Sequence, residues 1–466
     1  CSAAGWYLRA AEQSQGVEAL ELRRLAGDHL LRCGRIDEAM PVLREVLAEV
    51  GVKMPSTRRE VLTSLLWRRA RLAMPWHPRI AEKRERLERH RLRTDVALSC
   101  GATLAVVDSI LGASLHALGL LEAKRLGDPD RLAVALGYEV GYAAIAGSGG
   151  LARTERALDA AAAAAKSAGT PFAEAHMLWM RGMHAFLIGR FKDAVVLLDG
   201  AARAFAERCP GRVWEQAQAE LFAAWAVSHV GDLRELENRL GELERVARWH
   251  DDVFTATMAG AGNSVLLPLA ADEPAAARER VASAMAGWSQ DGFHIQHVLA
   301  LQGTCEIDLY EGDGLGAWKR VTGAWPELER SLLLRIQHTK VFTLDVRARA
   351  AIASGDRDAL DDAERCVKRL LAEKLPWADA LAHARQAGIA GARGQSEEAR
   401  ALLARAADEL EALGIGIPAL TARLRLAALE GKSIEQAPAW QALREKGITR
   451  PERWMATFQP WRELKR

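Results

Sequence analysis

WSQDGFHIQHVLALQGTCEIDLYEGDGLGAWKRVTGAWPELERSLLLRIQH, residues 288–338, is the stretch from which the fold can be inferred. Apolar side chains recur every three or four residues from Ile295 onward and share one side of an α-helix: Val298, Leu301, Cys305 and Leu309. The segment Glu311-Gly-Asp-Gly314 ends this helix, because glycine adopts the left-handed backbone of a helix end without steric cost. A second apolar stripe follows at helical spacing: Trp318, Val321, Trp325 and Leu328. Neither helix buries its stripe alone, so the hairpin requires neighbouring hairpins on both sides.

The same hairpin pattern recurs through most of the chain. Its bends are predicted at Gly147, Gly189, Gly231, Asp272, Gly312, Gly355, Gly394 and Gly431, with successive spacings of 42, 42, 41, 40, 43, 39 and 37 residues. This period exceeds the roughly 34 residues of a tetratricopeptide unit, so each helix is expected to be about one turn longer. The sequence therefore predicts an all-α fold, a tetratricopeptide-like right-handed superhelical solenoid of antiparallel helical hairpins with a period of about 40 residues.

The chain divides into three predicted parts. Residues 1–78 form N-terminal helical hairpins, residues 79–436 form the main solenoid, and residues 437–466 form C-terminal capping helices and a tail. Pro75-Trp-His-Pro78 is the predicted break between the first two parts, since proline interrupts helices. The final short amphipathic helices are expected to cover the last apolar face of the array, as the ends of solenoids require.

Composition narrows the function classes. The 63 basic and 61 acidic residues give a net charge of +2, so no global field attracts nucleic acid or an anionic membrane. The six cysteines are far apart and form no CxxC pair, which is typical of reduced thiols in a cytoplasmic protein. The chain contains no apolar run of about 18 residues, so no membrane span is predicted. It opens at Cys1-Ser-Ala-Ala-Gly without methionine, and we expect a fragment of a longer polypeptide.

The sequence carries no recognisable catalytic motif. GxxxxGK[ST], the Rossmann glycine fingerprint, GxSxG and HExxH are all missing, so we predict that this chain is not an enzyme and has no cofactor. His294, His297 and His338 lack acidic or thiolate partners at metal-ligand spacing, so no metal site is predicted. Carboxylates such as Asp251, Asp252 and Glu235 occur on charged helix faces and are interpreted as solvated surface.

The segment from Arg58 to Arg93 is strongly basic. Clustered guanidinium groups attract phosphate, but glutamates at three- and four-residue spacing indicate faces that pair with themselves. We therefore favour docking against an acidic partner domain over binding of nucleic acid.

A partner is expected in the concave groove of the solenoid, where the first helix of each hairpin faces inward. In the central unit this helix is predicted from about His294 to Tyr310, and the next first helix begins near Arg335. Side chains off the buried stripe are predicted to converge on the groove beside Trp288 or Trp325 and to bind a protein or peptide: His297, Gln302, Glu306, Arg335, Gln337 and His338. The alternative interpretation is that these polar groups only solvate a structural repeat.

Several phrases resemble the C-terminal tetratricopeptide-like region of large bacterial proteins that join a serine/threonine protein kinase to a signalling ATPase of the STAND class. These are ALELRRLAGDHLLRCGRIDEAMPVLREVLAEVG at 19–51, AERCPGRVWEQAQAELFAAWAVSHVGDLREL at 206–236, AMAGWSQDGFHIQHVLALQGTCEIDLYEGDGLGAWKRV at 284–321 and LPWADALAHARQAGIA at 375–390. The resemblance implies a sensor or regulatory arm that contacts the kinase and ATPase domains of the parent polypeptide. The catalytic elements of both enzymes are missing from this chain, so no catalytic residue is implied here.

Two other functions stay open at this point. The chain can be a free-standing helical-repeat scaffold, or the effector-binding arm of a transcription regulator built on the same ATPase-plus-repeat plan. The reading frame upstream of Cys1 distinguishes the three interpretations.

Overall fold

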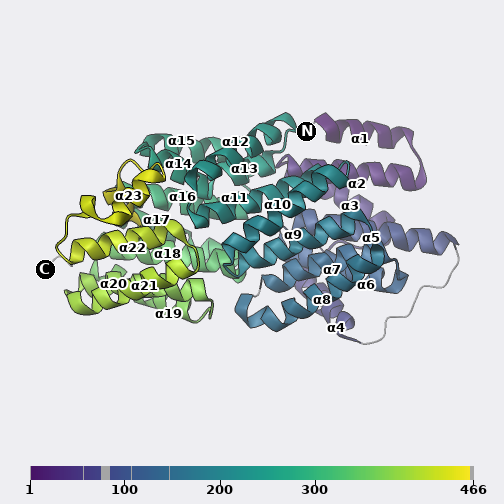
Figure 1. Ribbon diagram of the computed structural model, residues 1–466. Coiled ribbons are helices and arrows are strands. Elements are labelled where there is room, and N and C mark those ends of the chain that lie inside the picture. Colours follow the sequence, from purple (N-terminus) through teal and green to yellow (C-terminus); the bar gives the residue numbers. More distant parts are fainter. Residues whose placement is uncertain (1, 56, 75–83, 106–107, 146, 462–466) are drawn as a thin grey trace.

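The computed structural model describes residues 2–55, 57–74, 84–105, 108–145 and 147–461 (Figure 1). Within these ranges every regular element is helical, with 24 α-helices, four short 3₁₀ segments and no strand. The predicted all-α helical-repeat fold is confirmed. Figure 1 shows the purple N-terminal helices at the right of the molecule and the yellow C-terminal helices at the left.

The N-terminal helices precede the regular array. They are α1 Ser2–Gln13, α2 Gly16–Arg32, α3 Ile36–Glu49, α4 Arg58–Ala73, α5 Arg84–Leu104 and α6 Ser109–Leu126. The array itself consists of α7 Pro129–Ala144, α8 Leu151–Ala168, α9 Pro171–Leu187, α10 Phe191–Arg208, α11 Val213–Val230, α12 Leu233–Trp249, α13 Val253–Gly260, α14 Leu266–Ala270, α15 Pro274–Met285, α16 Ile295–Tyr310, α17 Gly314–Ser331, α18 Gln337–Ser354, α19 Arg357–Leu371, α20 Pro376–Ala392, α21 Ser396–Ala412, α22 Gly416–Leu429, α23 Pro438–Glu445 and α24 Pro451–Phe458. The 3₁₀ segments are η1 Gly147–Gly150, η2 Gly262–Val265, η3 Leu333–Arg335 and η4 Ile434–Gln436.

All eight predicted bends lie between consecutive helices and have positive φ. At Gly189, between α9 and α10, φ is 87°, and the next amide, of Arg190, reaches back to the carbonyl of Ala185 at 2.8 Å. That hydrogen bond satisfies a carbonyl that would otherwise be left unpaired at the helix end. The following helix often starts on an aspartate cap, as at Asp232 and Asp356, whose carboxylates accept from the amide three residues on.

The central hairpin has the predicted limits. Helix α16 begins after His294 and ends at Tyr310, and α18 begins at Gln337, two residues after Arg335. The predicted stripes are largely buried at this hairpin: Val298, Cys305, Leu309, Val321, Trp325 and Leu328 are each at most 7% exposed. The period of the apolar side chains therefore identified the packed face of both helices.

The array folds back on itself, so that bends of early hairpins contact the starts of later first helices. The Gln337 amide of α18 donates to the Ile145 carbonyl at 3.1 Å, beside the bend at Gly147. In the next pair, a Cβ on Gly189 would lie 2.3 Å from the ring of Trp377, at the start of α20. Gly231 similarly faces Ile417 at the start of α22. This second layer of contacts fills space that an open superhelix would leave as a groove.

The N-terminal helices are continuous with this packing. Helix α2 contacts α5, and α4 contacts α6, so core contacts extend across the predicted division near residue 78. The predicted break, Pro75 to Pro78, lies outside the described residues. The predicted C-terminal capping helices correspond to α23 and α24.

Two further expectations concern the cysteines and the membrane. The five described cysteines are buried and unpaired: Cys33, Cys100, Cys209, Cys305 and Cys366. No single described helix is long and apolar enough to cross a membrane. Helix α13 and the segment Gly262–Ala270 together have sufficient length and apolar composition, but they are bent by 51° relative to each other.

Candidate partner-binding cavity

Two polar side chains predicted to bind a partner are enclosed between α16 and α18. Gln302 is 5% exposed and donates to the Thr343 hydroxyl at 2.9 Å. Glu306 is 4% exposed and accepts a hydrogen bond from Arg349 at 2.7 Å. Both groups therefore have partners inside the array, and the one cavity that Glu306 lines is small, about 50 Å³.

The start of α18 is also enclosed. The Gln337 side chain accepts from the Ser148 amide at 2.9 Å and donates to the Glu373 carbonyl at 2.9 Å. The His338 ring lies 3.3 Å from the His229 ring between their Nε2 atoms, and burial lowers the pKa of His338 to about 4. These side chains connect hairpins distant in sequence.

The remaining predicted side chains near α16 and α17 have intramolecular partners as well. Trp288 is 3% exposed and donates to the His294 ring at 3.2 Å, and His297 accepts from the His294 amide at 3.0 Å. Trp325 is 7% exposed and donates to Glu329 at 2.8 Å. His294 and His297 thus close the first turn of α16, as a capping pair does.

The prediction that six polar side chains converge on one concavity is wrong. His297, Gln302, Glu306, Gln337 and His338 occupy separate places in the packing, because the second layer of hairpins covers the face that the hairpin pattern left open. Repeat spacing defines which face of a helix is apolar, but it does not define what covers the opposite face. The sixth of these polar side chains, Arg335, is exposed and lies at a cavity.

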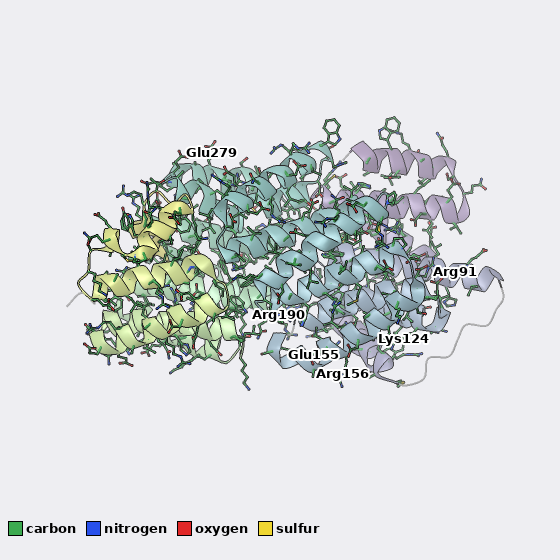
Figure 2. The ribbon with its side chains drawn as sticks, in the orientation of Figure 1. Arg91, Lys124, Glu155, Arg156, Arg190 and Glu279 are labelled. Atoms are coloured by element: carbon green, nitrogen blue, oxygen red, sulfur yellow. The ribbon has the colours of Figure 1, made fainter. Side chains whose placement is uncertain are left out.

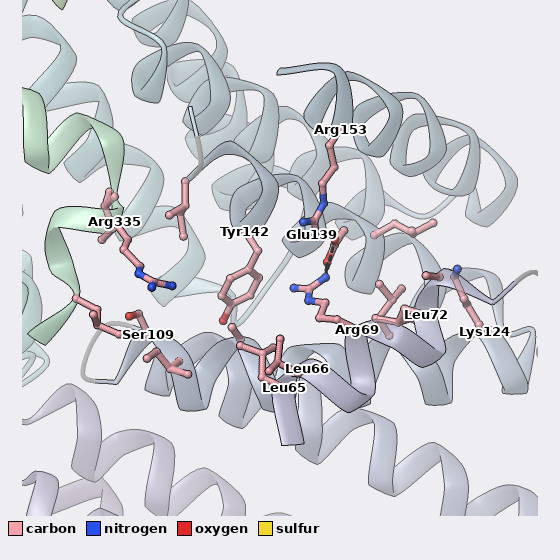
Figure 3. A pocket seen from close by; sticks show the side chains of 18 residues that line it. Leu65, Leu66, Arg69, Leu72, Ser109, Lys124, Glu139, Tyr142, Arg153 and Arg335 are labelled. Carbon is pink, nitrogen blue, oxygen red and sulfur yellow. Dashed lines mark hydrogen bonds and ion pairs between the residues drawn. The ribbon is translucent and has the colours of Figure 1, made fainter. Parts of the chain in front are cut away.

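Arg335 points into a cavity of about 690 Å³ between the N-terminal helices and the α17–α18 connection (Figure 3). We call it the α4–α7 cavity, and its lining residues are Leu65, Leu66, Arg69, Leu72, Ala73, Ser109, Ile110, Ala113, Leu120, Lys124, Leu136, Glu139, Tyr142, Ile145, Arg153, Leu332, Arg335 and Ile336. Most of these side chains are aliphatic, with a few polar groups among them, which is the usual composition of a binding pocket.

Glu139 is the single carboxylate on the lining, and both of its oxygens already have hydrogen-bond partners. Arg69 donates to it at 2.5 and 2.7 Å, Arg153 at 2.8 Å, and the His116 ring lies at 3.1 Å. Burial would raise the pKa of Glu139, but the hydrogen bond with His116 and the charge of Arg69 outweigh it and hold that pKa well below its usual range. Glu139 is therefore ionised at neutral pH and cannot act as a general acid there.

Four cations line the cavity against this one carboxylate. Arg69 and Arg153 share Glu139, whereas Lys124 and Arg335 have no ion pair among the residues that the structure describes. Figure 3 shows the Lys124 and Arg335 side chains at opposite ends of the cavity, with Tyr142 and Glu139 between them. The lining therefore carries unneutralised positive charge above an aliphatic floor.

Helix α4 leaves large apolar side chains uncovered beside this charge. Leu66, which lines the cavity, is 68% exposed, and its neighbour Trp67 is 60% exposed. Contiguous exposed apolar groups with a polar rim often mark interaction sites. Covering the Leu66 side chain would contribute about 1–2 kcal/mol to binding.

The basic segment that contains α4 is only partly a solvated face. Arg68 is 8% exposed and donates to the carbonyl and hydroxyl of Ser114 at 2.8 and 2.9 Å, so it attaches α4 to α6. Arg69 pairs with Glu139 of α7 and Arg93 lies 3.7 Å from Glu122 of α6. Arg69 and Arg93 thus lie against carboxylates of neighbouring helices, which differs from the expected pairing within the segment.

The opposite wall of the cavity holds a strained backbone. Leu332, which ends α17, has φ of 63°, a conformation that bulky residues rarely adopt. It places Leu333 to Arg335 as a 3₁₀ turn, which directs Arg335 toward the cavity. Sparsely populated backbone conformations of this kind concentrate at binding sites.

A second cavity, of about 780 Å³, adjoins the first and shares Ser109 and Ile110 with it. Its charged lining is mixed: Asp37, Arg44, Arg58, Asp108, Asp291, Glu327 and Arg330. Of these two cavities, only the α4–α7 cavity has an excess of cations on its lining. No group of three or more metal-ligating side chains occurs within the described part of the chain.

Sequence reasoning identified Arg335 but missed the opposite side of the cavity. The phrase LAVALGYEVGYAA at 132–144 contains a signal, because Glu139 is a lone carboxylate in an apolar helical stretch. A buried carboxylate requires a cation. Its partner, Arg69, is 70 residues earlier in the chain, and no local pattern connects the two.

Comparisons with known proteins give no family. No protein-family model matches the chain, and no curated protein matches it. Among solved structures, the chain is similar to one described as the crystal structure of Rap protein complexed with competence and sporulation factor, with 14% sequence identity and a TM-score of 0.42. That alignment covers 92% of this chain and 100% of the other.

Proposed function

We propose that the chain is a non-catalytic binding arm, and that its α4–α7 cavity recognises an acidic, amphipathic segment of a partner protein. The observation that carries this proposal is the pairing of unneutralised cations with uncovered aliphatic side chains on one lining. Lys124 and Arg335 have no carboxylate partner within the described residues, while Leu66 of the same lining is 68% exposed.

The chemistry of the cavity defines the partner segment. Aspartate or glutamate side chains would complete the ion pairs of Lys124 and Arg335, and Leu, Ile or Phe side chains would cover the floor formed by residues such as Leu66 and Ile110. A cationic segment would face four positive charges against one occupied carboxylate. Charge complementarity therefore selects acidic partners over basic ones.

The state of the ionisable groups supports a non-catalytic role. Glu139, the single acid of the cavity, is held ionised by Arg69, Arg153 and His116. The rest of the lining is mostly aliphatic, and the hydroxyl groups of Ser109 and Tyr142 have no free carboxylate or histidine on the lining to activate them. The cavity is suited to recognition.

The wider role that we propose is regulation of a kinase and/or STAND ATPase in the parent polypeptide. The support for it is the sequence resemblance of the hairpin phrases to such fusion proteins, together with a helical array that offers binding surfaces and no phosphate loop. Partner binding at the cavity would then release or hold the enzymatic domains.

Selection from a displayed library of random peptides tests the binding proposal. We expect the full-length chain to enrich peptides that combine Asp or Glu with Leu, Ile or Phe, and Arg335→Glu to weaken binding of a selected peptide by about tenfold or more. Arg156→Glu is the matched control, because Arg156 is an exposed arginine of α8 outside the cavity lining (Figure 2). Enriched peptides without acidic residues, or equal losses in both variants, would refute the proposal.

The reading frame upstream of Cys1 tests the regulatory role separately. A kinase domain followed by a phosphate-loop ATPase would support it. A start codon at this point would instead support a free-standing scaffold, and a helix-turn-helix domain in the parent would support a transcription regulator.

A further inference from the structure

The C-terminal segment of the chain lies against a row of arginines on three first helices. Arg349 of α18, Arg385 of α20 and Arg425 of α22 occupy equivalent hairpins, and we call them the arginine track. Each donates to a main-chain carbonyl: Arg349 to Thr457 at 3.3 Å, Arg385 to Phe458 at 2.7 Å and Arg425 to Gln459 at 2.9 Å. Arginines of three successive hairpins thus donate hydrogen bonds to three successive main-chain carbonyls.

Main-chain carbonyls are present in every peptide, so this contact mode does not depend on the sequence that occupies the track. Side chains of the segment add further contacts: the Gln459 amide nitrogen donates to the Pro418 carbonyl at 3.2 Å, its oxygen accepts from Arg385 at 3.5 Å, and the Arg349 guanidinium group lies 5.0 Å from the centre of the Phe458 ring. Proteins that bind a peptide along a sheet edge use the same division, with main-chain hydrogen bonds for affinity and side-chain pockets for specificity.

Helix α20 is shaped for the segment that follows Gln459. A Cβ on Gly388 would lie 3.2 Å from the Pro460 carbonyl oxygen, and a Cβ on Gly391 would lie 2.3 Å from the ring of Trp461. Glycine at these two positions leaves a channel along α20 in which residues 460 and 461 lie. The segment is therefore seated on a built surface.

The charges of the track are incompletely neutralised by the segment. Arg349 pairs with Glu306 and Asp345, and Arg385 lies 3.3 Å from Asp345. Arg425 has no carboxylate partner among the described residues and faces the Gln459 carbonyl alone. Three guanidinium groups thus share two carboxylates, and the occupant supplies dipoles where a carboxylate would bind more strongly.

We propose that the arginine track is a second binding surface, for a partner segment that carries a carboxylate near Arg385 and Arg425. Residues 457–461 are its intramolecular occupant and compete with that partner. A tethered occupant acts at a high effective concentration, so the surface opens only to a segment that makes the better ion pairs. This surface is distinct from the α4–α7 cavity, and neither inference depends on the other.

A labelled peptide with the sequence of residues 456–460, in which Gln459 is replaced by glutamate, is the probe. It is amidated at its C-terminus, so its glutamate is the single carboxylate, and its binding to the full-length chain is followed by fluorescence anisotropy. We expect the chain with Gln459→Ala and Trp461→Ala to bind the probe about tenfold more tightly than the unaltered chain, because the occupant is weakened. Arg425→Ala in that background should remove this gain, and Gln441→Ala, an exposed glutamine of α23, should change nothing.

A chain with Gln459→Ala and Trp461→Ala that binds no more tightly, or an Arg425→Ala change without effect, would show that the segment is only a structural cap. Gly391→Ala gives a second variant if the first fails to fold, since alanine favours the helix and its methyl group displaces the Trp461 ring alone. The same affinity criterion applies to it. In the unaltered chain, excess probe should increase hydrogen exchange of the amides of Thr457, Phe458, Gln459 and Trp461, and unchanged exchange would also overturn the proposal.

Discussion

Replacement of Glu306 by glutamine tests whether the charges between α16 and α18 are structural. Arg349 is 1% exposed, and its guanidinium group is bound by Glu306, by Asp345 at 2.9 Å and by the Thr457 carbonyl. Glu306→Gln keeps the shape of the side chain and removes its charge, so Arg349 and Arg385 would share Asp345 alone.

The expected loss follows from burial. Breaking a buried ion pair by removing one partner costs about 3–5 kcal/mol, since the remaining charge stays out of water. Asp345 still neutralises part of the charge, so we expect the lower end, about 3 kcal/mol. An exposed pair gives the contrast: Glu397, at 87% side-chain exposure, pairs with Arg400, and Glu397→Gln should cost less than about 1 kcal/mol.

Urea unfolding followed by far-ultraviolet circular dichroism measures both variants, with the free energy of unfolding taken from the midpoint and slope. The double variant Glu306→Leu with Arg349→Met should be destabilised much less than Glu306→Gln. Its apolar pair has a similar volume and leaves no uncompensated charge at this position. A loss below about 1 kcal/mol for Glu306→Gln, equal to that of Glu397→Gln, would refute the structural role. Glu306 would then contribute no more to stability than an exposed carboxylate.

Two further predictions concern the contacts between layers. Gly189→Ala should destabilise the chain by more than Gly394→Ala in the same urea assay. Both positions have positive φ, but only at Gly189 would the added methyl group collide with a neighbour, the Trp377 ring at 2.3 Å. Equal losses of stability would contradict this packing. Burial lowers the pKa of His338 to about 4 beside His229, whose pKa is also lowered, so the unfolded chain binds more protons and the urea midpoint should fall as pH decreases from about 6.5 to about 4. His338→Phe should make that fall shallower, and an unchanged slope would show that the ring titrates freely.

The local features of the fold were predictable because each has a local cause. A bend requires a residue that tolerates positive φ, and Gly312 and even Asp272 mark such positions at regular spacing. The limits of α16 follow from a stripe of period 3.6 that ends in Glu311-Gly-Asp-Gly314. These signals act within a few residues and need no knowledge of the rest of the chain.

The covering of each face was not predictable, because it depends on contacts between distant hairpins. Gln337 and His338 are polar residues at the start of a first helix, which is typical of a solvent-facing position. They are enclosed because Ile145, Ser148 and His229 pack on them from the earlier layer. Arg335, two residues earlier, remains at the rim and faces the cavity.

The central claim, that the α4–α7 cavity binds acidic segments through Arg335, is tested most directly by a charge swap. A peptide selected on the full-length chain is synthesised with its acidic residue replaced by lysine, and both peptides are titrated into the unaltered chain and Arg335→Glu by calorimetry. We expect each single reversal to weaken binding by about tenfold and the double reversal to restore most of it, as a direct ion pair requires. Independent losses, with no recovery in the double reversal, would contradict the account.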